Sequence, residues 1–244
     1  MPTESRRRPW GRRDSLLGLG LGLAALGLAW TAAQGLTREL LRIPPNRFLE
    51  LHETRLDSPE DAGRSRDKAL ELYERLPSWA LGSVELRRLG KLWLLKALDE
   101  RAAGQDADAA IVAGEAALDA SLRLAPIQPL AWAYRADLAR LRTAGAPLAC
   151  RILKGSYAVA PVEPDFAVYR LGVALECVEH WDIELLGMIR RDVRALFAPG
   201  AHGAERRALV EVTREDPRLT AFVERLLKDD AEGLALYRRG LGIR

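Results

Sequence analysis

The chain has 244 residues, a formal net charge of +3 and a hydrophobic fraction of 48%, which suit a protein that folds around a core. The positive charge is confined to residues 1–14, which carry five arginines against two acids, so the rest of the chain is neutral overall. A domain that binds nucleic acid needs a basic face that displaces counterions. We therefore expect no nucleic-acid partner.

Residues 15–37 contain no charged side chain and are rich in leucine, which predicts a single transmembrane helix. Five arginines precede this segment and only Arg38 and Arg42 follow it closely. The positive-inside tendency then makes residues 1–14 a basic cytoplasmic tail and puts the remainder on the far side of the membrane. The residues that we assign to the anchor are Leu16, Leu19, Leu21, Leu23, Leu26, Leu28 and Trp30.

A cleavable signal peptide is the alternative for this segment. A basic start, an apolar stretch and Thr31-Ala32-Ala33 fit a cleavage site, and residues 11–17 resemble a twin-arginine leader except at Ser15. The uncharged stretch is longer than a usual signal-peptide core, which favours a retained, uncleaved signal anchor. We expect the Pro44-Pro45 pair to end the helix and residues 38–57 to form a juxtamembrane linker.

Helices separated by proline and glycine fill the next part of the chain, residues 58–179, and no strand pattern occurs. Ser58-Pro59-Glu60-Asp61 is a typical helix start, with a capping serine followed by acids near the positive end of the helix dipole. The spacing predicts helices over residues 58–76, 78–104, 106–124, 129–142, 147–159 and 164–179.

One stretch of this region occurs twice. Residues 120–139 and 155–174 are related by a shift of 35 positions, and seven of the twenty aligned residues are identical. The identical pairs are Ser121/Ser156, Ala125/Ala160, Pro126/Pro161, Pro129/Pro164, Tyr134/Tyr169, Arg135/Arg170 and Ala139/Ala174. A period of this length predicts stacked helical repeats.

The unit from Pro126 to Pro161 resembles a tetratricopeptide repeat (TPR). Trp132 stands where the first helix of such a unit carries its large residue, and small residues stand at the packing positions Ala136, Ala149 and Ser156. The unit departs from the pattern at Ala139, where an aromatic residue is usual, and it is one residue longer. The next unit keeps Leu171-Gly172 in a shifted register. The resemblance covers residues 78–179 and implies a TPR-like α-solenoid.

Residues 180–244 lack this period, and we expect them to form a helical cap on the last repeat. Asp182 is the expected N-cap of a helix that ends before Pro199, and three helices should follow over residues 204–213, 217–228 and 231–239. The repeat pair, the Asp-capped helix and the arginine-rich tail also resemble membrane-anchored repeat proteins found with bacterial surface-polysaccharide machinery.

Tyr134, Arg135, Tyr169 and Arg170 are the candidate partner-binding residues. They occupy the same place in two successive first helices and could present aromatic and cationic contacts in the groove of the solenoid. The alternative is that each tyrosine packs between helices, while each arginine lies over an apolar neighbour with its charged group in water.

No cofactor, metal or catalytic group is expected. His52, His180 and His202 stand in unrelated segments without ligand spacing, and no phosphate-binding loop or nucleophile motif occurs. Cys150 and Cys177 could form one disulfide if the domain lies outside the cytoplasm, but two buried free thiols are the favoured interpretation.

The sequence therefore predicts an all-α protein, not an enzyme, with one N-terminal transmembrane helix followed by a TPR-like solenoid. It would act as a scaffold or adaptor for protein partners in the bacterial envelope, anchored in the inner membrane with the solenoid in the periplasm. Its resemblances associate it with exopolysaccharide or capsule biosynthesis or export. The alternatives are a secreted periplasmic α-solenoid that is an enzyme or enzyme subunit, and a solenoid that stays in the cytoplasm.

Overall fold

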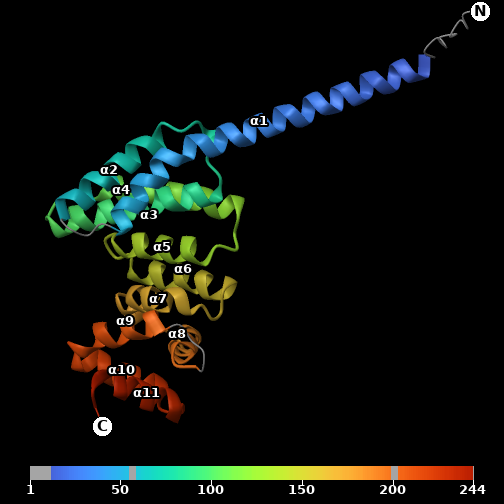
Figure 1. Ribbon diagram of the computed structural model, residues 1–244. Coiled ribbons are helices and arrows are strands. Elements are labelled where there is room, and N and C mark those ends of the chain that lie inside the picture. The colour runs from blue at the N-terminus through green and yellow to red at the C-terminus, as the bar shows by residue number, and fades with distance from the viewer. Residues whose placement is uncertain (1–11, 55–58, 199–202, 244) are drawn as a thin grey trace, which may run out of the picture. The chain divides into compact units, whose positions relative to one another are not determined.

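The computed structural model describes the backbone of residues 12–54, 59–198 and 203–243, and the side chains of residues 23–49, 60–198 and 203–243. Within these ranges the chain forms eleven α-helices, three short 3₁₀-helices and no strand, which confirms the predicted all-α class (Figure 1). The chain divides into two compact units, residues 1–80 and 81–244. The division lies inside the segment that we expected to hold the repeats.

The first unit contains a helix much longer than predicted. Helix α1 runs from Arg12–Thr54 with Pro44 and Pro45 inside it, so the prediction that these prolines end the helix is wrong. Tertiary contacts on either side of the prolines keep the chain helical. The Arg42 guanidinium donates to the carbonyl of Ala80 at 2.9 and 3.1 Å, and the Tyr73 hydroxyl donates to Asn46 Oδ1 at 2.5 Å.

The partners of α1 come from the same unit. Tyr73 lies on α2 (Pro59–Glu74) and Ala80 ends the 3₁₀-helix η1 (Ser78–Ala80). The lost backbone hydrogen bonds of two prolines are therefore offset by side-chain bonds and packing.

The predicted anchor falls on the N-terminal half of α1. Leu23, Leu26, Leu28 and Trp30 are all at least 63% exposed, whereas Leu16, Leu19 and Leu21 lie outside the residues whose side chains are described. Among the residues whose side chains the structure describes, no helix is both long enough and apolar enough to cross a bilayer.

The second unit begins with stacked helix pairs. Helix α3 packs against α4, α5 against α6 and α7 against α8, while α5 also contacts α3 and α4. The pairs follow one another through this unit in chain order (Figure 1). Their bounds are Ser83–Ala102 for α3, Asp108–Leu124 for α4, Pro129–Arg140 for α5, Ala146–Val159 for α6, Ala167–Leu175 for α7 and Ile183–Leu196 for α8.

The repeated serine has the same role in both copies of the repeated stretch. The Ser121 hydroxyl on α4 donates to the carbonyl of Ser83, the first residue of α3, at 2.7 Å. The Ser156 hydroxyl on α6 donates to the carbonyl of Pro129, the first residue of α5, at 2.8 Å. Both serines are fully buried, and each joins the C-terminal part of the second helix of a pair to the start of the first helix.

Two predicted helices differ most from the structure in their bounds. The helix expected from Ser78 begins at Ser83, where the Glu85 carboxylate accepts a hydrogen bond from the Gly82 amide at 3.1 Å. The helix expected to reach Glu179 ends at Leu175. The 3₁₀-helices η2 (Pro164–Phe166) and η3 (Val178–His180) flank it, so α7 is much shorter than predicted.

Three further helices complete the second unit, close to where the sequence predicts them. They are α9 (Gly203–Arg214), α10 (Pro217–Leu227) and α11 (Ala231–Leu241). Their buried residues join those of α6, α7 and α8 in one hydrophobic core. The C-terminal helices are thus continuous with the last repeat.

Candidate partner-binding site

The repeated tyrosines meet in the structure. Tyr134 lies on α5 and Tyr169 on α7, and their rings form an edge-to-face pair with centroids 5.4 Å apart. They come together because equivalent positions on successive first helices of a solenoid lie side by side. Both tyrosines are half-buried and pack against the hydrophobic cores.

The Tyr169 hydroxyl is used within the protein. It donates to Asp137 Oδ2 on α5 at 2.6 Å, and Asp137 also accepts a hydrogen bond from Arg140. Burial, and then the neighbouring Asp137 carboxylate, raises the pKa of Tyr169 well above its ordinary value. The hydroxyl therefore stays protonated and links α7 to α5.

Arg135 reaches back to the preceding helix. Its Nη1 lies 2.7 Å from Glu115 Oε1 and its Nε lies 2.9 Å from Asp119 Oδ1, both on α4. Arg142 also bonds Glu115, which raises the pKa of Arg142. Two arginines and two acids thus form a balanced, partly exposed cluster that links α4 to α5 and to the turn after α5.

Arg170 has a different environment although it holds the equivalent position. Its side chain is 0% exposed, its Nη1 donates to the carbonyl of Ala160 at 2.8 Å, and its Nη2 donates to Asp192 Oδ1 at 2.9 Å. The guanidinium carbon lies 4.3 Å from the ring centre of Tyr157 and 4.9 Å from that of Phe166. This arginine caps the end of α6 from inside the core, and its charged group is not in water.

The buried carboxylate opposite Arg170 is itself perturbed. Asp192 on α8 is 1% exposed, and burial raises its pKa to about 6 while Arg170 acts against that rise. The Glu163 amide donates to the same carboxylate at 3.2 Å. The pair therefore ties α8 to both α7 and the turn before it.

The two arginines therefore do not form one repeated surface. Tyr134, Arg135 and Tyr169 are half-buried, whereas Arg170 is fully buried and bonds groups in the interior. The sequence offers no signal for this difference, because Asp192, the buried acid that pairs with Arg170, lies on α8, outside the repeated stretch.

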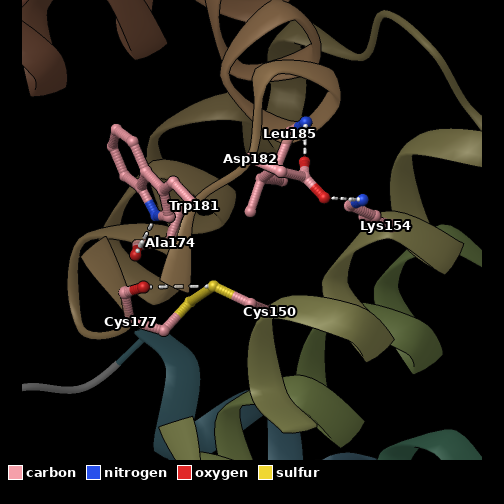
Figure 2. Close-up of a disulfide and its surroundings, with 7 residues drawn as sticks. All are labelled: Cys150, Lys154, Ala174, Cys177, Trp181, Asp182 and Leu185. Carbon is pink, nitrogen blue, oxygen red and sulfur yellow. Dashed lines mark hydrogen bonds and ion pairs between the residues drawn. A yellow bond between two sulfur atoms is a disulfide. The ribbon is translucent and has the colours of Figure 1, made fainter. Parts of the chain in front are cut away.

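Cys150 and Cys177 form a disulfide, so the favoured prediction of two free thiols is wrong (Figure 2). The helix predicted over residues 164–179 would have placed Cys177 inside it. Since α7 ends at Leu175, Cys177 lies in the turn before η3, with its Cα 6.0 Å from that of Cys150. That separation is within the usual range for a disulfide.

The same junction has polar ties (Figure 2). The Trp181 indole N–H donates to the Ala174 carbonyl at 2.8 Å, and Asp182 Oδ1 accepts from the Leu185 amide at 2.9 Å. The second interaction confirms the predicted N-cap. Lys154 on α6 bonds Asp182, which raises the pKa of Lys154 and lowers that of Asp182. Helix α6 thus holds the α7–α8 junction by a covalent bond and an ion pair.

Sequence reasoning missed a hollow between α8 and α10, which we call the α8–α10 groove. It has a volume of about 590 Å³ and is lined by Val178, Trp181, Ile183, Leu186, Gly187, Arg190, Phe222, Arg225, Leu226 and Lys228. One signal was present: Ile183 and Leu186 form a second apolar stripe on α8, beside the buried stripe of Leu185 and Ile189.

The described part of the chain contains no group of three or more histidine, cysteine or acidic residues placed to hold a metal. Of the candidate histidines, His52 and His202 lie outside the described side chains, and His180 ends η3. Comparison with protein-family models, curated proteins and solved structures finds no match to the chain.

Proposed function

We propose that this protein is a membrane-tethered, TPR-like scaffold or adaptor whose solenoid binds a protein partner in the bacterial envelope. One observation carries the proposal: the repeated tyrosines Tyr134 and Tyr169, both half-buried, form an edge-to-face pair that links α5 and α7. Stacked helix pairs characteristically bind partners along such aligned faces, because each pair adds equivalent positions to one continuous surface. The scaffold acts by equilibrium binding and not as an enzyme.

Within this proposal Tyr134, Arg135 and the ring of Tyr169 contact the partner directly. Arg135 retains partial exposure next to Glu115 and Asp119, so the cluster can exchange an internal ion pair for one with the partner. Arg170 has a positioning role, because its bonds to Ala160 and Asp192 fix the start of the third helix pair. Tyrosine and arginine are the residue types that most often dominate binding energy at protein interfaces.

Two features support a periplasmic position for the solenoid, with a single pass through the inner membrane and a cytoplasmic N-terminus. The arginine-rich residues 1–14 precede the uncharged segment, which fits the positive-inside tendency. The buried disulfide between Cys150 and Cys177 suits an oxidising compartment. Tethering would raise the local concentration of the binding face near the membrane.

The resemblance to repeat proteins of surface-polysaccharide machinery directs the search for a partner toward exopolysaccharide or capsule biosynthesis and export. The test is copurification of the full chain from membranes in mild detergent, after crosslinking in intact cells. Tyr134→Ala with Arg135→Ala should remove the partner. The matched control is Arg123→Ala with Arg151→Ala, which changes two exposed cations of α4 and α6.

Arg170 is left intact in this experiment, because its loss would disturb folding and obscure the result. A partner retained equally by the Tyr134/Arg135 variant and the control would refute the proposed face. A reporter fused after Arg244 that is active only in the cytoplasm would refute the periplasmic position. A shortened mature N-terminus in mass spectrometry would select the secreted form over the anchored one.

A further inference from the structure

We propose that the α8–α10 groove is a second docking site, which accepts an acidic amphipathic helix of a partner protein. The groove is separate from the tyrosine pair on α5 and α7, so it goes beyond the proposed function and does not depend on it. Its apolar lining comes from the α7–α8 junction, α8 and α10, and consists of Val178, Trp181, Ile183, Leu186, Phe222 and Leu226.

Three of these apolar side chains, Val178, Ile183 and Leu186, are exposed, whereas Leu226 is buried in the core and Trp181 and Phe222 pack against it. Ile183 is 91% exposed, Val178 is 51% exposed and Leu186 is 39% exposed. The rings of Trp181 and Phe222 pack against each other with centroids 5.4 Å apart and form the base of the groove. A helix pair that merely caps a solenoid presents a polar outer face, whereas a contiguous exposed apolar patch marks an interaction site.

The positive charge of the groove favours an acidic partner. Its described lining contains three cations, Arg190, Arg225 and Lys228, and no acidic residue. Arg190 is paired with Asp229 and donates to the Leu226 carbonyl at 3.1 Å. Arg225 and Lys228 are exposed and have no ion-pair or hydrogen-bond partner among the described residues.

The acids next to Arg225 and Lys228 in the sequence pair with other arginines. Glu224 accepts a hydrogen bond from Arg238 at 2.7 Å, and Asp229 pairs with Arg190 and Arg194. Arg225 and Lys228 therefore form an uncompensated positive rim beside an apolar floor, and the complementary ligand is apolar on one face and acidic at its edge.

The shape of the groove favours a helix. Ile183, Leu186 and Arg190 recur at the i, i+3, i+7 spacing of one face of α8, and this face rises about 10 Å, or two helical turns. A third helix fits the channel between two helices, which is how α5 packs on α3 and α4 in the same unit. A single acyl chain fits poorly, because a floor with Ile183 at 91% exposure does not shield it from water.

The test is fluorescence polarisation of the full chain with a labelled amphipathic peptide of about 18 residues, with leucines on one face and glutamates elsewhere. The paired probe carries lysine in place of every glutamate. We expect the acidic peptide to bind at least about tenfold more tightly than the basic one, with affinity that falls as salt rises.

The variant Arg225→Glu with Lys228→Glu should weaken binding of the acidic peptide at least about tenfold. Its matched control is Arg123→Glu with Arg151→Glu, which makes the same change in charge at two exposed cations that do not line the groove. Circular dichroism checks the fold of both variants. Ile183→Asp provides an independent change at a side chain that the core does not use, and it should also abolish binding.

Equal affinity for the acidic and basic peptides would overturn the proposal. An equal loss of affinity for the acidic peptide in the groove variant and in its control would also overturn it. Displacement of the peptide by phosphatidylglycerol vesicles, but not by phosphatidylcholine vesicles, would reassign the groove to an anionic lipid. Dimers of the full chain that Arg225→Glu with Lys228→Glu dissociates would reassign it to a second copy of this chain. Either reassignment refutes the helix proposal and leaves the Tyr134 surface untouched.

Discussion

Removing the disulfide should destabilise the folded chain by a predictable amount. The variant Cys150→Ser with Cys177→Ser opens a covalent loop with a sequence separation of 27 residues. In the chain-entropy description, a crosslink that closes a loop of this length lowers the entropy of the unfolded chain enough to stabilise the native state by about 3.5 kcal/mol at 25 °C. That is a large share of the roughly 5–15 kcal/mol by which a domain is stable.

The assay is urea denaturation of the full chain, followed by the helical circular dichroism signal, under oxidising conditions. The expected loss of about 3.5 kcal/mol corresponds to a fall in melting temperature of roughly 7–14 °C for a unit of this size. Because both cysteines are at most 3% exposed, the oxidised protein should also resist mild reductants while it remains folded. Full reduction in denaturant should reproduce the stability of the double variant.

Lys154→Ala is the control at the same junction. Lys154 loses its ion pairs with Asp182 and Glu184, but these acids are largely exposed, so the loss should stay below about 1 kcal/mol. A loss below about 1 kcal/mol for the cysteine variant, or equal losses for the two variants, would refute the argument that the disulfide stabilises the α6–α7–α8 junction through the unfolded state.

The remaining predictions concern the repeated serines and the buried ion pair. Ser121→Ala and Ser156→Ala should each cost about 1 kcal/mol in urea denaturation, because each removes one hydrogen bond from a serine to a carbonyl, and Ser121 also accepts a bond from Gln128 Nε2 at 3.2 Å. The two losses should add in the double variant, because the bonds lie in separate helix pairs, and strong non-additivity would contradict this. At pH 7.5, Arg170→Met and Asp192→Asn should each lower the free energy of unfolding by about 3–5 kcal/mol, since each single change leaves one buried polar group without its partner. The double variant should lose less than the sum of the two, and fully additive losses would refute an energetic coupling between Arg170 and Asp192. The pKa of Asp192 is raised in the folded state to about 6, so its contribution to stability is greatest below the ordinary pKa near 4 and is lost as pH rises through 6. This dependence of stability on pH should vanish in Asp192→Asn. An NMR titration of the Asp192 carboxyl group with a midpoint below pH 4 would contradict the prediction.

Local sequence signals predicted most helix positions in the second unit. Pro129 starts α5 because a helix does not need the missing amide at its first position, and Asp182 caps α8 through the predicted side-chain bond. Both signals act within a few residues, so they can be recognised without knowledge of the fold.

The errors arose where distant residues decide the outcome. Pro44 and Pro45 normally end a helix, but contacts from Tyr73 and Ala80 keep α1 continuous. The end of α7 at Leu175, which no proline or glycine marks, decides whether Cys177 can reach Cys150. Neither effect can be deduced from the spacing of residues along the chain.

The repeated Tyr-Arg pair shows why internal identity is a limited guide to function. Arg135 pairs with acids on the helix before it, whereas Arg170 pairs with Asp192 on the helix after it. The arginine of the same dipeptide is therefore partly exposed in one copy and fully buried in the other, because the helix that follows differs. Repetition conserves the positions that stack helices, such as Ser121 and Ser156, while the exposed apolar and cationic groove lies on α8 and α10, outside the repeated stretch. Partner recognition at that groove would then be set by the non-repeated helices, and substitutions in them should alter binding without weakening the stack.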